Sequence, residues 1–113
     1  MVSLHGTPTA AELVEAVREW IERDVLTSTE GRLRFHARVA VNVLATVERE
    51  LAVGEEQEVA HRERLASLGL ADDVELARAI RNGDLDDRFD EVRAVLRADV
   101  DDRLAVANPK YAR

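Results

Sequence analysis

The residues of this chain that could do chemistry are three histidines and 23 acidic side chains, because its 113 residues include no cysteine. Thiolate metal sites, disulfides and cysteine nucleophiles are therefore excluded. The histidines stand far apart and lack the HxxxH or HExxH spacing of a zinc site. We expect His5 to lie in a flexible tail and His36 to be a hydrogen-bonded core residue on the apolar side of its helix. We expect His61 to be solvated among its charged neighbours.

Acidic residues three apart could bind magnesium if two such pairs faced one cleft. The pairs with this spacing are Glu12–Glu15, Glu19–Glu22, Asp84–Asp87, Asp87–Asp90 and Asp99–Asp102. The first two lie opposite the apolar arc of their helix with arginines among them, which is typical of a solvated face. The acids after Gly83 lack the central glycine of a calcium loop and suit a helix N-terminus instead. We predict no metal site and no cofactor.

The sequence also lacks a motif for nucleophilic catalysis, since none of the three serines stands in a GxSxG sequence. We therefore predict a protein that is not an enzyme. The remaining catalytic alternative is a magnesium-dependent hydrolase that uses acids of the first and last helices.

Arginine is the main basic residue, and one helix carries a polar strip that could bind an anion or a partner. The strip consists of Arg34, Arg38, Asn42 and Arg49, and His36 lies close by in the sequence. Arginine forks bind carboxylates and phosphates in a bidentate way, which makes the strip a candidate docking site. The simpler interpretation, which the sequence favours, is a row of surface arginines paired with acids of a neighbouring helix. The net charge of -7 argues against nucleic acid or an anionic membrane as the partner.

The elements that must position these residues are all helical. The expected helices cover about 9–25, 29–53, 55–68, 73–82 and 86–107. Capping boxes are predicted at Thr9 with Glu12, Thr27 with Glu30 and Asp72 with Glu75, and helix ends at Gly54, Gly69 and Gly83. The expected fold is one all-α bundle of about five helices, a single domain over 1–113 with an ordered core over about 9–107 and short tails.

The packing of this bundle follows from the apolar positions. The second helix is apolar over an arc of roughly 200°, which predicts a central helix with contacts on several sides. The last helix has a predicted core stripe of Phe89, Val92, Leu96, Val100, Leu104 and Ala107, beside an ion pair of Asp99 with Arg103. Alanine accounts for 17 residues, so the core is thin, and burial against a second copy or another protein is expected to complete it, with a monomeric bundle as the alternative. Of these possibilities, we predict a dimer.

The sequence has no signal-like N-terminus and no apolar run near the ~20 residues of a membrane helix. The expectation is a cytoplasmic protein without a membrane partner.

Three stretches resemble a family of small, uncharacterised bacterial domains. They are PTAAELVEAVREWIERDV over 8–25, GRLRFHARVAVNVLATVEREL over 31–51 and LAVANPKY over 104–111. Members of that family are encoded beside, or fused to, aminoglycoside-phosphotransferase-like kinases and often near acyl-CoA dehydrogenases. The matching motif positions are Arg34, Phe35, His36, Arg38, Asn42, Glu48, Arg49, Asn108, Pro109 and Tyr111. The resemblance implies an accessory protein that works with a kinase-like partner, and it supplies no catalytic residue.

The leading hypothesis is a non-catalytic interaction domain that self-associates, docks on a phosphotransferase-like kinase, or does both. The alternative from another class is a module that binds an acyl-CoA or phosphorylated ligand between helices, near His36 and Arg38.

Overall fold

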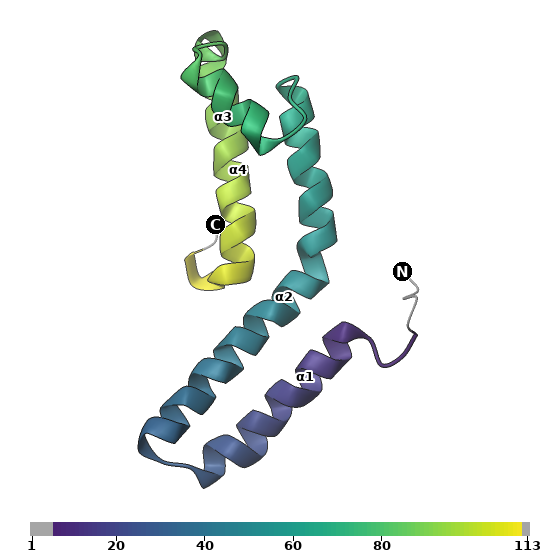
Figure 1. Ribbon diagram of the computed structural model, residues 1–113, viewed down its shortest axis with the longest axis vertical. Helices are drawn as coiled ribbons and strands as arrows, with labels where there is room; N and C mark the ends of the chain where they lie inside the picture. The colour runs from purple at the N-terminus through teal and green to yellow at the C-terminus, as the bar shows by residue number, and fades with distance from the viewer. Residues whose placement is uncertain (1–5, 112–113) are drawn as a thin grey trace. The chain divides into compact units, whose positions relative to one another are not determined.

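The computed structural model describes residues 6–111, and every regular element in this range is helical (Figure 1). The all-α class is therefore confirmed. The elements are α1 (Ala10–Trp20), the π-helical turn η1 (Ile21–Val25), the 3-10 turn η2 (Leu26–Ser28), α2 (Gly31–Ser67), α3 (Asp73–Arg81), the 3-10 turn η3 (Asp86–Arg88), α4 (Phe89–Ala107) and the 3-10 turn η4 (Pro109–Tyr111). His5 lies outside the described residues.

The described part of the chain has four α-helices instead of about five. The predicted helix end at Gly54 is wrong, so the helices expected over 29–53 and 55–68 form one helix. The helix α2 continues through Gly54 to Ser67 and is 37 residues long. A glycine inside a helix costs only about 1 kcal/mol relative to alanine, and the charged residues that follow, Glu55 and Glu56, are good helix formers. The helix ends at Gly69 instead, whose φ of 78° is in the left-handed region.

Two of the three predicted caps form. The capping box of Thr9 with Glu12 is complete. At α3, Asp72 accepts the backbone N–H of Glu75 at 2.8 Å, while the Glu75 carboxylate accepts from the N–H of Ala71. The predicted box at Thr27 is wrong, since Thr27 lies in η2 and its hydroxyl donates to the Arg23 carbonyl at 2.7 Å.

The described residues form two compact units, of which unit 1 ends at Val53 and unit 2 begins at Gly54. The helix α2 contributes its first part to unit 1 and its second part to unit 2. In unit 1, α1 and the first part of α2 form an antiparallel hairpin (Figure 1). Its buried residues among those described are Ile21 and Ala37.

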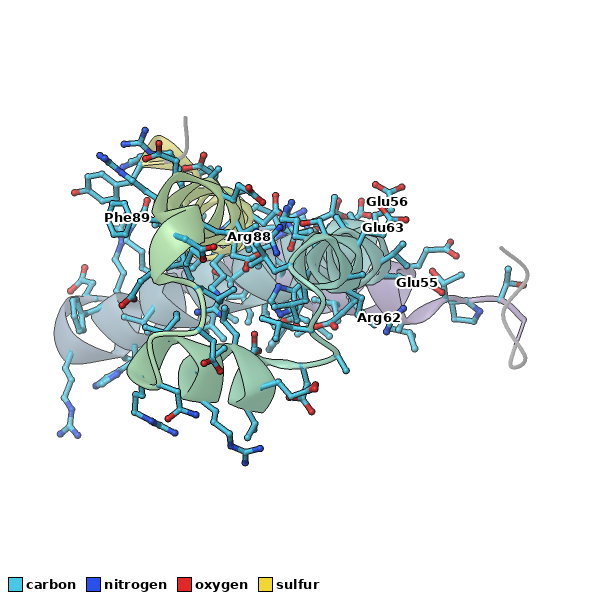
Figure 2. All side chains as sticks on the ribbon, turned by 90° about the horizontal axis from the view of Figure 1, so that it is seen from above. Glu55, Glu56, Arg62, Glu63, Arg88 and Phe89 are labelled. Atoms are coloured by element: carbon cyan, nitrogen blue, oxygen red, sulfur yellow. The ribbon has the colours of Figure 1, made fainter. Side chains whose placement is uncertain are left out.

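Unit 2 has the larger core, built from the second part of α2, α3 and α4. The residues of this core are Leu65, Leu68, Leu76, Ala79, Leu85, Val92 and Val95. Arg88, at the start of α4, lies on the side facing α2 (Figure 2), and its guanidinium donates to the Ser67 carbonyl at 3.0 Å. This bond ties the start of α4 to the end of α2.

The buried side of α4 differs from the predicted stripe. Of the stripe's members, Val92 is buried, whereas Phe89, Leu96 and Val100 are exposed. Phe89 points away from α2 (Figure 2). The covered side is centred on Val92, Val95 and the carboxylate of Asp99 instead. Within residues 6–111, no helix combines the length and the apolar character that crossing a bilayer requires.

Candidate functional site

The predicted arginine strip lies on α2 within unit 1. Arg34, Arg38 and Asn42 are exposed and follow one another at a spacing of four, which keeps them on one side of the helix. Arg49 lies two turns further along and is half-buried, and its guanidinium donates to the Thr46 hydroxyl at 3.1 Å. The structure thus places these four side chains in a row.

His36 does not join this row, and its predicted place in the core is wrong. The ring is exposed and lies edge-on to Phe35, with centroids 5.7 Å apart. Its Nε2 is 3.5 Å from Nε of Arg32, one turn earlier on α2. The apolar arc of α2 is wider than the area that α1 covers, so a residue within the arc can still face solvent.

A polar cluster that the sequence did not indicate joins the two helices of unit 1. Arg18 of α1 donates to Glu48 of α2 and to Glu22 of η1, and these bonds raise the pKa of Arg18 above its ordinary value, the bond to Glu48 most strongly. An open hollow of about 480 Å³ lies beside the cluster. It is lined by Arg18, Glu22, Val41, Ala45, Glu48, Arg49 and Ala52. Two arginines therefore meet two glutamates, so the hollow has balanced charge.

Exposed apolar side chains occupy the other broad face of the hairpin. On α1, Arg18 and Val17 come three and four residues before the buried Ile21, so they lie on opposite sides of it. On α2, Glu48 lies close to the row of the buried Ala37, which faces α1, whereas Val43 lies roughly 120° around the helix from Ala37, on the other side. Since Arg18 and Glu48 bond to each other on one face, Val17 lies toward the opposite face, and Val43 lies at the edge of that face, on a side of α2 turned largely away from α1.

We call this opposite face the apolar face. Its large members are Leu13, Val17 and Trp20 of α1, with Val43 of α2 at its edge. Trp20 is 51% exposed and Val43 55% exposed. Large uncovered apolar patches of this kind mark sites of protein association.

Unit 2 contains a second polar cluster, centred on His61. The predicted solvated state of His61 is wrong, since only 19% of the side chain is exposed. Nε2 lies 2.9 Å from an Asp73 oxygen and Nδ1 lies 3.0 Å from an Asp99 oxygen. The hydrogen bond to Asp99 is the main cause that raises the pKa of His61 above its ordinary value, and burial works against it. The imidazole therefore holds α2 to both α3 and α4.

The same cluster continues one turn along α2. Arg64 donates to Asp99 at 2.5 Å and to Asp102 at 2.8 Å, and Gln57 donates to the Asp102 carbonyl at 3.0 Å. The pKa of Arg64 is raised, chiefly by the bond to Asp102. Asp99 thus pairs with Arg64 and His61 on α2, instead of the predicted Arg103. A signal for this cluster exists in the sequence: His61 and Arg64 are three apart, as are Asp99 and Asp102.

These contacts leave the polar groups of both clusters engaged with one another. Among the described residues, no buried side-chain nitrogen or oxygen lacks a hydrogen-bond partner. Nor does any group of three or more His, Asp or Glu side chains within 6–111 have an arrangement that could hold a metal ion. Both clusters therefore join helices to each other, and the exposed side chains of the apolar face take no part in them.

A comparison with known protein families identifies the family of this chain. The family described as Domain of unknown function (DUF6285) matches residues 27–111, which include α2, α3 and α4. The chain belongs to this family. The DUF6285 region begins after α1 and η1, so the matched part contains one of the two helices of the hairpin. No curated protein and no solved structure matches the chain significantly.

Proposed function

We propose that this DUF6285 protein is a non-catalytic interaction domain, whose hairpin binds another protein surface through its apolar face. The observation that carries the proposal is the exposure of four large apolar side chains, Leu13, Val17, Trp20 and Val43, on one side of unit 1, whereas the buried residues among those described in this unit are Ile21 and Ala37. A segment of this size with so little buried area usually gains stability from a partner, since the chain has no disulfide to constrain it.

The kind of partner follows from the family resemblance. We propose a bacterial, cytoplasmic accessory protein that associates with itself, with a phosphotransferase-like kinase, or with both. The row of Arg34, Arg38, Asn42 and Arg49 lies on the side of α2 away from the apolar face, so it remains accessible when that face is covered. Carboxylates of a kinase-like partner are the groups that such a row would bind.

The other functions considered from the sequence have less support. A ligand site near His36 and Arg38 would need a cavity there, but both side chains are exposed, and the hollow beside Arg18 and Glu48 is lined by other residues. A hydrolase would need acids from α1 and α4, yet Glu12 caps its own helix. Asp99 and Asp102 in turn are paired with Arg64.

The test of the proposal replaces Val17 and Val43 by glutamine. We expect the double variant V17Q/V43Q to lose association, because two amide groups would be buried without partners in the apolar contact. Light scattering on a sizing column checks this, with the chain alone and co-expressed with its phosphotransferase-like neighbour.

The matched control is V74Q, which changes an exposed valine of α3 in unit 2 and should leave association intact. Circular dichroism of each variant establishes that the helices are retained. Association that survives V17Q/V43Q in both the homomeric and the heteromeric experiment would contradict the proposed function.

A further inference from the structure

The helix α3 is attached to the rest of unit 2 by few contacts. It has nine residues, and isolated helices shorter than about 12–15 residues are marginal in water. Two of its side chains, Leu76 and Ala79, are buried in the core. Among the side-chain hydrogen bonds and ion pairs within residues 6–111, the contact of Asp73 with His61 is the one that joins α3 to another helix. The attachment of α3 therefore depends on two apolar side chains and one polar contact.

The helix α4, in contrast, is attached to α2 by a group whose charge does not depend on pH. Arg64 donates to Asp99 at 2.5 Å and to Asp102 at 2.8 Å. An arginine side chain keeps its proton at every pH at which proteins are folded. A histidine changes its charge between about pH 5 and 8. A change of pH in this range therefore acts on the attachment of α3 and leaves the arginine bonds of α4 in place.

The loss of one proton leaves the His61 ring with one N–H, and burial decides which carboxylate keeps it. The charged groups around the ring are Asp73 of α3, Asp99 of α4 and, on α2 itself, Arg64, which is bound to Asp99 and Asp102. The Asp99 side chain is 11% exposed, whereas that of Asp73 is 64% exposed and can be solvated by water.

A buried carboxylate that loses a donor costs more free energy than an exposed one. The remaining proton of His61 therefore stays on Nδ1, toward Asp99. The lone pair of Nε2 then faces the Asp73 oxygen at 2.9 Å, and a contact that was attractive becomes repulsive. The neutral ring thus keeps its bond to α4 and loses its bond to α3.

We propose that α3 is a pH-operated flap of unit 2, closed on α2 while His61 is protonated and open once the ring is neutral, with α4 staying in place. The connections on the two sides of α3 contain Gly69 and Gly83, whose φ angles of 78° and 77° are in the left-handed region. Residues of this kind can absorb the backbone rotation that opening requires. Opening exposes Leu76 and Ala79, which the closed flap buries.

The direction of the pH effect follows from the charged form of the ring. The pKa of His61 is raised above its ordinary value of 6.5, chiefly by the bond to Asp99, so protonation favours the closed flap. The closed flap is fully favoured below about pH 6.5 and becomes less favoured as pH rises through the folded value. The flap belongs to unit 2 and does not use the apolar face of unit 1, so its failure would leave the proposed function unaffected.

The test uses the absence of cysteine from the sequence, because one introduced thiol can then report on the flap. A79C places a thiol on the buried side of α3, and A77C places one on its exposed side. The rate of alkylation by iodoacetamide is measured for both variants between pH 5.5 and 8.5. The ratio of the two rates removes the rise in thiolate with pH. We expect the rate of A79C relative to A77C to increase about tenfold over this range, the effect of one charge-assisted hydrogen bond.

Three controls separate the flap from general loosening of unit 2. V95C places a thiol on the buried side of α4, and its rate relative to A77C should change by less than about twofold. In the H61Q background, the relative rate of A79C should be independent of pH. D73N keeps the shape of its side chain and removes its charge, so it should also abolish most of the pH dependence. Circular dichroism establishes that each variant retains its helices.

Three outcomes would overturn the inference. One is a relative rate of A79C that stays constant with pH in the original background. Another is an equal increase for V95C, which would mean that unit 2 opens as a whole. The third is a pH dependence that persists in H61Q, which would assign it to another group. Hydrogen exchange of the α3 amides in the unsubstituted chain, corrected for the intrinsic rate at each pH, gives the same three answers if A79C disturbs the packing.

Discussion

The imidazole of His61 lies between carboxylates from two different helices, Asp73 of α3 and Asp99 of α4. Both ring nitrogens face oxygen atoms, and the protonated ring can donate to both. Arg64, on the same helix as His61, shares Asp99 with it. The ring therefore contributes to the stability of unit 2 in its charged form.

We expect the stability of unit 2 to decrease as pH rises. The pKa of His61 is raised in the folded chain, so its contribution is fully present below about pH 6.5 and is lost as pH rises through the folded value. Urea unfolding between pH 5.5 and 8.5 measures this. The free energy of unfolding should exceed that of H61Q at low pH, and the gap should narrow as pH increases.

The control for His61 is H36Q, which removes an exposed histidine of unit 1. If the difference in the free energy of unfolding between the original protein and H61Q stayed constant over the whole pH range, this would contradict the assigned role of the imidazole.

At the scale of the helical elements, Gly54 and Gly69 show that the same residue type can have opposite roles. Gly54 lies inside α2, whereas Gly69 follows its end with φ at 78°. Alanine is favoured over glycine in a helix, and it is strained in the left-handed region.

We therefore expect G54A to raise the free energy of unfolding by about 0.5–1 kcal/mol, and G69A to lower it by about 1 kcal/mol. Thermal and urea unfolding followed by circular dichroism measure both changes. Equal signs for the two substitutions would mean that one of these helix assignments is wrong in solution.

At the scale of the whole molecule, the proposed self-association links stability to concentration. Association that involves only the folded chain stabilises it by mass action, so Tm should rise as protein concentration increases. A hundredfold increase in concentration should shift the Tm by several degrees, since about 2.7 kcal/mol corresponds to a hundredfold excess over a dissociation constant. Differential scanning calorimetry checks this. In V17Q/V43Q the Tm should be independent of concentration, and a concentration-dependent Tm in that variant would place the contact elsewhere.

The sequence by itself determined the helical class and most helix boundaries. Thr9, Asp72 and Gly69 act through groups within a few residues of their own position, and local spacing is enough to recognise them. Gly54 was misassigned because a helix tolerates one glycine when the flanking residues favour helix.

Only the tertiary structure decided which sides of the helices are covered. The sequence placed Leu96 in the core of α4 and left Asp99 at its edge, whereas the structure buries Asp99 beside Arg64 and exposes Leu96. The structure also covers most of the His61 side chain and leaves His36 exposed. The physical reason is that the apolar side of a helix is wider than the area that one neighbouring helix can cover. Which of its residues are buried therefore depends on the helix that packs against it. That neighbour comes from residues far away in the chain.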